Sequence, residues 1–138
     1  MTEAKRNLAL VKEAYRRWNE EKGTAFDFWL DLLAEDVDFC SLGAGAAGLE
    51  FTEDCSCKDS VRAYFEGLGA DWEMLHYSPK DYIVEGDRIA MRGHCGWRHR
   101  RSGKEIETPK ADFFRFRDGK VAEFYEFFDT AAALAATK

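Results

Sequence analysis

Four strand-like runs separated by glycine-containing turns constrain the fold of this chain more than any other feature. The runs cover residues 72–84, 88–99, 105–117 and 121–128. The turns between them contain Gly86, Gly103 and Gly119. Strand-like runs joined by such short turns are typical of antiparallel hairpins. The second half of the chain is therefore predicted to be an antiparallel meander.

The residues before this meander have helical spacing instead. Leu8, Val11, Tyr15 and Trp18 form one apolar stripe in a predicted helix over residues 3–22. Helices followed by strands indicate an α+β fold, with three N-terminal helices packed on one face of a curved antiparallel sheet. The further elements expected before the meander are helices at residues 24–35 and 56–69 and a short strand at 37–42.

Length and charge limit the organisation of the chain and its partners. A length of 138 residues is that of one domain, residues 1–138. Twenty basic residues against 26 acidic ones give a formal net charge of −6, which repels phosphate backbones and anionic lipids. We therefore expect neither nucleic acid nor a membrane as a partner. Because residues 1–7 are followed by no signal-type apolar run, we expect a cytoplasmic location.

The cysteines and histidines do not have the spacing of common metal or redox motifs. Cys55 and Cys57 are separated by one residue, whereas zinc knuckles and redox motifs have two residues between their cysteines. His76, His94 and His99 match no HExxH or H-x3-H pattern. We expect reduced thiols, no dedicated metal site and no cofactor.

The turn at Ser102-Gly103 sets which residues of the second hairpin face each other. A two-residue turn gives two opposite-charge pairs across the strands, which favours that register. A three-residue loop with a bulge instead shifts the register by one and brings His94, a possible general base, beside Asp112. The two-residue turn pairs Arg98 with Glu107, Arg100 with Glu105, Cys95 with Lys110, and Gly93 with Asp112.

With the two-residue turn, three charged side chains gather on one largely apolar face of the sheet. Alternation puts Lys110 and Asp112 on this face, and the turn at 117–119, read as a type I turn with a glycine bulge, adds Glu126. Charges among aromatic side chains are costly to bury unpaired, so they pair, meet water or bind a ligand. Two interpretations follow, a ligand site or an internal ion network that holds the strands in register.

The segments 110–121 and 126–129 (KADFFRFRDGKV and EFFD) resemble the C-terminal hairpin of the nuclear transport factor two-like superfamily. This superfamily includes ketosteroid isomerase and the SnoaL-like polyketide cyclases, and the resemblance implies a cone-shaped half-barrel with a pocket between helices and sheet. Asp112 matches the protonated oxyanion-hole acid of the isomerase. Tyr15 lies near the tyrosine of the first helix in that family. Ser41 stands near the position of the catalytic base, and no Asp-Pro is present.

The resemblance and the charged face together predict an enzyme. We expect an acid–base enzyme of isomerase, cyclase or dehydratase type, which acts on a small hydrophobic molecule in an enclosed pocket. Asp112 and Glu126 are the acid and base candidates, and Lys110 would polarise or anchor an oxygen. The alternative is a non-catalytic small-molecule-binding or dimerisation module of the same fold. The predicted substrate-binding residues are Tyr15, Trp18, Trp97, Phe114, Phe124 and Phe128.

Two other features have a competing interpretation. Residues 43–48 match G-x-G-x-x-G, but a dinucleotide site needs this loop to open a helix, and the acidic residues that follow repel phosphate, so we expect a flexible pocket-rim loop. Cys95 is predicted to be a small buried hydrophobic residue in preference to a nucleophile, because no histidine is placed to activate it.

The opposite face of the sheet is too aromatic to be left wholly to solvent. Exposed apolar patches usually mark interfaces, so we expect a homodimer formed through the sheet. The residues expected on this face are Arg92, His94, Arg98, Phe113, Arg115, Tyr125 and Phe127.

Overall fold

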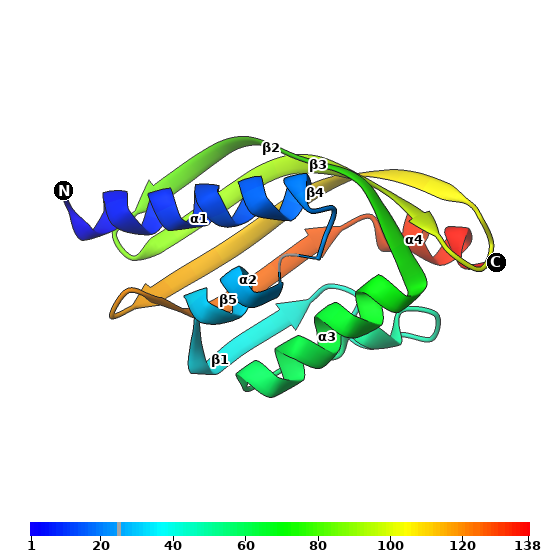
Figure 1. Cartoon of the computed structure of the whole chain (residues 1–138), viewed down its shortest axis with the longest axis horizontal. Helices are drawn as coiled ribbons and strands as arrows, with labels where there is room; N and C mark the ends of the chain where they lie inside the picture. Colours follow the sequence, from blue (N-terminus) through cyan, green and yellow to red (C-terminus); the bar gives the residue numbers. More distant parts are fainter. Residues whose placement is uncertain (25) are drawn as a thin grey trace.

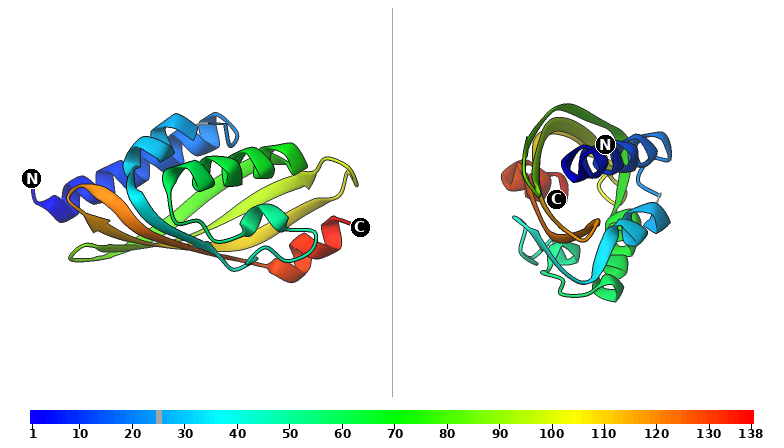
Figure 2. Two further views of the ribbon diagram at one scale, coloured as in Figure 1. Left: turned by 90° about the horizontal axis from the view of Figure 1, so that it is seen from below. Right: turned by 90° about the vertical axis from the view of Figure 1, so that its left-hand side faces the viewer.

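A five-stranded curved sheet forms the framework of the molecule (Figure 1). The computed structural model describes residues 1–24 and 26–138. The strand order is β1-β5-β4-β3-β2, and the sheet curls around the helices when it is viewed from one end (Figure 2). The strands are β1 (Leu33–Ser41), β2 (Trp72–Glu85), β3 (Arg88–His99), β4 (Glu105–Arg117) and β5 (Lys120–Phe128).

The last four strands form the predicted antiparallel meander. The first strand, β1, joins it in parallel beside β5, so the sheet is mixed. Parallel neighbours cannot be joined by a hairpin turn, and the chain between β1 and β5 includes α3, β2, β3 and β4. The α+β fold with a cone-like, unclosed sheet is therefore confirmed, with one parallel pair that the expected antiparallel sheet did not include.

Helices cover the inner, concave face of this sheet (Figure 2). The helix α1 packs on β2, and α3 packs on β1 and on a short 3-10 turn, η1. The C-terminal helix α4 was not predicted. It is capped by Asp129, whose side chain accepts a hydrogen bond from the Ala132 N–H at 3.0 Å. The helical elements are α1 (Glu3–Glu20), α2 (Phe26–Leu32), η1 (Glu50–Thr52), α3 (Lys58–Asp71) and α4 (Thr130–Ala136).

The boundary between the second helix and the first strand differs from the prediction. The expected helix over residues 24–35 includes Ala25, which lies outside the described residues, and its described part ends at Leu32. Residues from Leu33 onward are extended instead, because Leu33 pairs with Val121 of β5. Pairing with a distant strand has overridden the local helical preference.

The predicted two-residue turn between β3 and β4 is wrong. Five residues, 100–104, connect these strands, and Arg98 faces Glu105 instead of Glu107. Contacts with the end of α4 hold the longer loop, since the Ser102 hydroxyl donates to the Ala136 carbonyl at 2.5 Å. The register is shifted by two residues from the predicted one, an even number, so the same side chains still share the inner face.

The final turn also differs from the prediction, but the predicted strand faces are retained. Asp118 and Gly119 both have positive φ, +52° and +78°, which corresponds to a two-residue type I′ turn rather than a type I turn with a glycine bulge. The bulge lies inside β5 at Ala122. The turn and the bulge together leave the same side chains of β5 on the inner face as predicted. Asp112 therefore lies directly opposite Glu126.

The main core fills the space between the helices and the inner face. Aromatic pairs are frequent in it, such as Phe39 with Phe124, whose ring centroids are 4.5 Å apart. Among the described residues, no helix is long and apolar enough to cross a membrane.

Candidate active site

An aromatic cavity of about 90 Å³ lies between the helices and the inner face of the sheet. Each helix, the 3-10 turn and each strand named above contributes at least one lining side chain. Most of the lining is apolar, and the polar groups are concentrated on β4 and β5 and on the tyrosines opposite them. The polar or ionisable lining residues are Tyr15, Tyr64, Tyr77, Cys95, Thr108, Lys110, Asp112 and Glu126.

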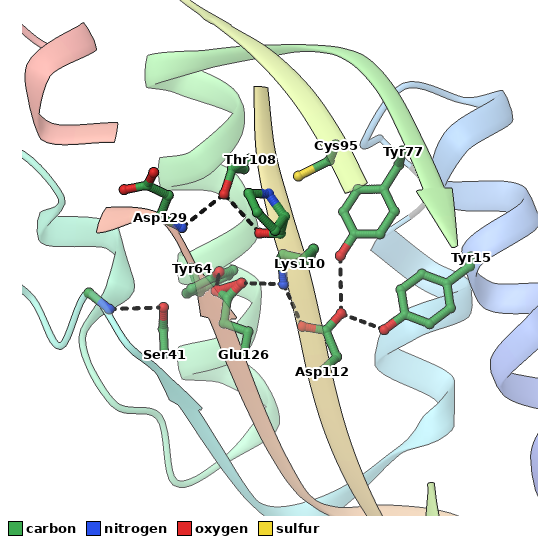
Figure 3. Close-up of polar contacts among 12 residues, drawn as sticks. Tyr15, Ser41, Tyr64, Tyr77, Cys95, Thr108, Lys110, Asp112, Glu126 and Asp129 are labelled. Atoms are coloured by element: carbon green, nitrogen blue, oxygen red, sulfur yellow. Dashed lines mark hydrogen bonds and ion pairs between the residues drawn. The ribbon is translucent and has the colours of Figure 1, made fainter. Parts of the chain in front are cut away.

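Lys110 lies between two carboxyl groups on the wall of this cavity (Figure 3). Its ammonium contacts Asp112, two residues along the same strand, and lies 3.0 Å from Oε2 of Glu126 on the neighbouring strand. All three residues are buried, with exposed fractions of 8% for Lys110, 1% for Asp112 and 6% for Glu126. The structure therefore brings together the three residues predicted to be catalytic.

Asp112 is held as a hydrogen-bond acceptor. The Tyr15 hydroxyl donates to its Oδ2 at 2.5 Å, the Tyr77 hydroxyl donates to the same oxygen at 3.0 Å, and Lys110 donates to Oδ1. Burial and the nearby Asp112 charge raise the pKa of both tyrosines well above the ordinary value, so they remain neutral donors. Three donors suit an ionised carboxylate, whereas the family resemblance implied a protonated acid here.

Glu126 has a different environment. Burial raises its pKa from 4.5 to about 7, and a hydrogen bond from Ser41 opposes part of this shift. The Tyr64 hydroxyl donates to its Oε1. One ammonium cannot neutralise two ionised carboxylates, so the uncharged form of Glu126 beside a Lys110–Asp112 ion pair leaves the cavity electrically neutral. Glu126 is therefore the group in this site that is poised to exchange a proton near neutral pH.

Five of the six predicted substrate-binding residues line the cavity: Tyr15, Trp18, Trp97, Phe124 and Phe128. Phe114 does not. Its ring packs in the core against Trp29 and Phe124, with centroids 6.2 Å and 5.1 Å away. Phe114 alternates in phase with Asp112, but it lies further along β4, where Trp29 of α2 closes over the sheet.

Sequence reasoning did not assign to the site four cavity residues whose side chains carry a hydrogen-bond donor: Tyr64, Tyr77, Trp29 and Trp72. Tyr64 and Tyr77 hold the two carboxyls, and the indole N–H groups of Trp29 and Trp72 are buried with no acceptor among the described residues. The sequence did contain a signal for Tyr64, because this residue, which carries a hydroxyl, lies on the apolar stripe of the third helix and therefore faces inward. Buried donors without a partner are uncommon, so these indoles are candidate ligand contacts.

The two alternatives left open by the sequence are now resolved. His94 lies on the outer face, since its neighbour Cys95 lines the cavity, so it is not beside Asp112. The loop 43–48 leads into the short 3-10 turn η1. Its Gly48 N–H donates to the carboxylate of Glu50, whereas in a dinucleotide site the backbone N–H groups of such a loop bind pyrophosphate. Leu49, at the end of this loop, lines the cavity.

Cys95 also lines the cavity without being activated. Burial raises the pKa of its thiol to about 11, and the Trp97 indole N–H donates to its sulfur at 3.3 Å. A neutral thiol is a weak nucleophile, which agrees with a packing role for this residue.

Comparison with known structures identifies the fold. The chain superposes on an NTF2-like protein of unknown function from Burkholderia pseudomallei with a TM-score of 0.86 and 22% identity, over 100% of this chain and 99% of the other. A protein with a ketosteroid isomerase-like fold from Catenulispora acidiphila, in complex with trimethylamine, matches with a TM-score of 0.75 and 16% identity over 93% and 91% of the two chains.

A third similar structure is a candidate SnoaL-like polyketide cyclase from Mesorhizobium loti. Its TM-score is 0.74, with 16% identity over 92% of this chain and 99% of the other. No curated protein matches the sequence. The SnoaL-like domain family matches residues 11–124, which include all the strands except the end of β5 and carry Lys110 and Asp112. On this match over most of its length, the chain belongs to the SnoaL-like domain family.

Proposed function

We propose that the chain is an acid–base enzyme, of isomerase, cyclase or dehydratase type, that moves a proton on a small hydrophobic molecule. The observation that carries this proposal is Glu126, a cavity carboxyl whose pKa is raised to about 7 beside the fixed Lys110–Asp112 pair. A general acid or base works best when its pKa lies near the working pH. An ion network that only holds strands together needs no group poised to titrate there.

The three charged residues divide the chemistry between them. Glu126 removes a proton from the substrate carbon or returns it to a neighbouring position. Lys110 has three N–H groups, and its contacts with Asp112 and Glu126 leave one for an oxygen of the substrate. That hydrogen bond would stabilise the negative charge that develops on the oxygen in the transition state. Asp112, fixed by Tyr15 and Tyr77, holds the Lys110 ammonium in place.

The cavity also limits the substrate. Its walls are mostly aromatic, which favours a flat apolar ring system. A volume of about 90 Å³ is below the roughly 150 Å³ of an engineered cavity that holds benzene, so lining side chains must move to admit a ring. The unpartnered indole N–H groups of Trp29 and Trp72 favour a molecule with additional oxygen acceptors. We expect a small cyclic ketone, enone or hydroxylated aromatic compound.

A deuterium-exchange assay tests the proposal directly. The chain is incubated in D2O with a panel of cyclic ketones and enones, and NMR follows exchange of the hydrogens next to the carbonyl group. Small molecules that copurify with the chain, identified by mass spectrometry, join this panel. Wild type should catalyse exchange on at least one compound that it binds.

Two variants separate catalysis from binding. Glu126→Gln cannot accept a proton and should lower the exchange rate by about 10²- to 10⁴-fold. Asp112→Asn keeps a similar shape and should lower it less, by weakening the hold on Lys110. If a copurified ligand binds both variants as tightly as wild type and is never converted by wild type, the site is a non-catalytic binding module, the alternative function for this fold.

A further inference from the structure

A second cluster of functional side chains lies on the outer face of the sheet, away from the cavity. His76 on β2, His94 on β3 and Glu107 on β4 each bring one potential ligand atom to within 4.8 Å of the others. Nε2 of His76 is 2.8 Å from Oε1 of Glu107, and Nδ1 of His94 is 3.0 Å from Oε2 of the same carboxylate. Two imidazoles and one carboxylate, carried by three neighbouring strands, thus lie close together.

Gly96 makes this convergence possible. It pairs with His76 on one side and with Glu107 on the other. A Cβ atom at Gly96 would lie 2.7 Å from Oε1 of Glu107 and 2.8 Å from Nε2 of His76, closer than real side chains approach. The two side chains meet over the space that a larger residue would fill, so the local backbone is adapted to the cluster.

The orientation of His76 is also fixed. Its Nδ1 lies 3.1 Å from the Ser78 hydroxyl, which can accept a hydrogen bond from an Nδ1–H. In that tautomer, the lone pair of Nε2 is directed toward Glu107 and is free to bind a cation. Histidine ligands in metal sites are commonly held by such a hydrogen bond to the other ring nitrogen.

We propose that His76, His94 and Glu107 form a binding site for a divalent transition metal ion of the Zn²⁺ class. Imidazole nitrogen and carboxylate oxygen are typical ligands of zinc. With metal–ligand distances of 2.0–2.2 Å, donor atoms around a tetrahedral ion lie roughly 3.3 Å apart, close to the 2.8 Å and 3.0 Å separations in this cluster. The ion would join β2, β3 and β4 and keep a fourth coordination position for water or an external ligand.

This proposal departs from the expectation of no dedicated metal site, which rested on spacing along the sequence. The three residues come from three different strands, so no short motif contains them. The site is also independent of the proposed acid–base chemistry, since it lies on the other face of the sheet. Loss of activity in the cavity would not affect it.

A zinc titration of the metal-free chain tests the proposal, with the imidazole nitrogen signals followed by NMR. The chain has three histidines. His99 is buried and its ring packs on Trp72, so it serves as the internal reference. One equivalent of Zn²⁺ should shift the signals of His76 and His94 and leave those of His99 unchanged. Saturation by zinc without a shift of His76 and His94 would overturn the proposal, because the ion would then be held elsewhere, for example by cysteines.

Substitutions provide the second test. Glu107→Gln should weaken zinc binding at least about tenfold, as loss of a ligand or its support does in metal sites. Gly96→Ala should also weaken it, by forcing His76 and Glu107 apart. The matched control is Glu105→Gln, two residues away on the same strand and face, which should keep the wild-type affinity within about twofold. Equal affinities for wild type and Glu107→Gln would reject the site even if Gly96→Ala fails to fold.

Discussion

Lys110 is a buried cation that contacts two carboxyls, and this imbalance determines the chemistry of the cavity. Asp112 accepts hydrogen bonds from two tyrosine hydroxyls and from the ammonium. Glu126 is also contacted by the ammonium and by the hydroxyls of Tyr64 and Ser41, but burial raises its pKa to about 7. Asp112 and Glu126, which pair across neighbouring strands, therefore acquire different roles because their surroundings differ.

The raised pKa of Glu126 predicts how stability depends on pH. The protonated form is favoured in the folded chain, so this stabilising contribution is complete below pH 4.5 and is lost as pH rises through about 7. Between pH 5 and pH 8, wild type should lose about 2 kcal/mol more unfolding free energy than Glu126→Gln, whose side chain does not titrate. Urea unfolding at both pH values measures this difference. Equal losses in the two proteins would show that Glu126 titrates normally.

A second prediction concerns the ion pair itself. Lys110→Met leaves two buried carboxyls without a cation and should lower the unfolding free energy by about 3–5 kcal/mol. The double variant Lys110→Met/Asp112→Asn should recover part of this loss, because it removes both charges. Arg92→Met, which breaks the exposed pair with Asp81 on the same sheet, is the control and should have little effect. Chemical denaturation measures all three. A double variant no more stable than Lys110→Met would argue against coupling of the two charges.

At the level of elements, the sheet supplies the charged groups and the helices supply the apolar walls. β4 and β5 position Lys110, Asp112 and Glu126 through strand alternation and direct pairing. The helix α3 and the turn η1 form one wall, and they approach so closely that a Cβ atom at Gly67 would lie 2.8 Å from Cβ of Phe51. This close contact fixes the wall that carries Tyr64 and Phe51.

Two glycines in α3 give a matched prediction for this wall. Gly67→Ala should lower the unfolding free energy by about 1–3 kcal/mol, because the new methyl group collides with Phe51. Gly69→Ala should raise it by about 0.5–1 kcal/mol, because nothing lies within 4 Å of its Cβ position and alanine favours a helix. Thermal and urea unfolding compare the two. A stabilising Gly67→Ala would mean that η1 is not held against α3.

At the level of the whole molecule, we expect a homodimer formed through the outer face of the sheet. Phe113, Tyr125 and Phe127 are 50%, 40% and 38% exposed there, and their rings pack together, with centroids 4.8 Å apart for Tyr125 and Phe127. An exposed cluster of aromatic side chains is typical of an interface. Light scattering should report a mass twice that of the 15.8 kDa chain. Phe127→Glu should give a monomer, whereas Leu42→Glu, at an exposed apolar residue outside this cluster, should not. A monomeric wild type at high concentration would reject the dimer.

Alternation and turn parity were sufficient to place the charged groups on one face. Lys110, Asp112 and Glu126 share it because side chains alternate with a period of two, and because both errors in the turns preserved parity. The three N-terminal helices and the antiparallel meander were also predictable, since local periodicity and glycine turns specify them. The family resemblance in residues 110–121 and 126–129 then indicated the cavity before any contact was known.

Contacts between distant segments decided the rest. The loop 100–104 is held in its longer form by a hydrogen bond to the end of α4. The strand β1 begins at Leu33 because this residue pairs with β5. Tyr77 reaches Asp112 from a strand 35 residues away, and His76, His94 and Glu107 meet only because three strands pair over Gly96. The sequence determined which side chains face inward, because that depends on local geometry. Tertiary packing decided which of them touch, and with it the ionisation of Glu126, because burial and hydrogen-bond partners are properties of the folded chain.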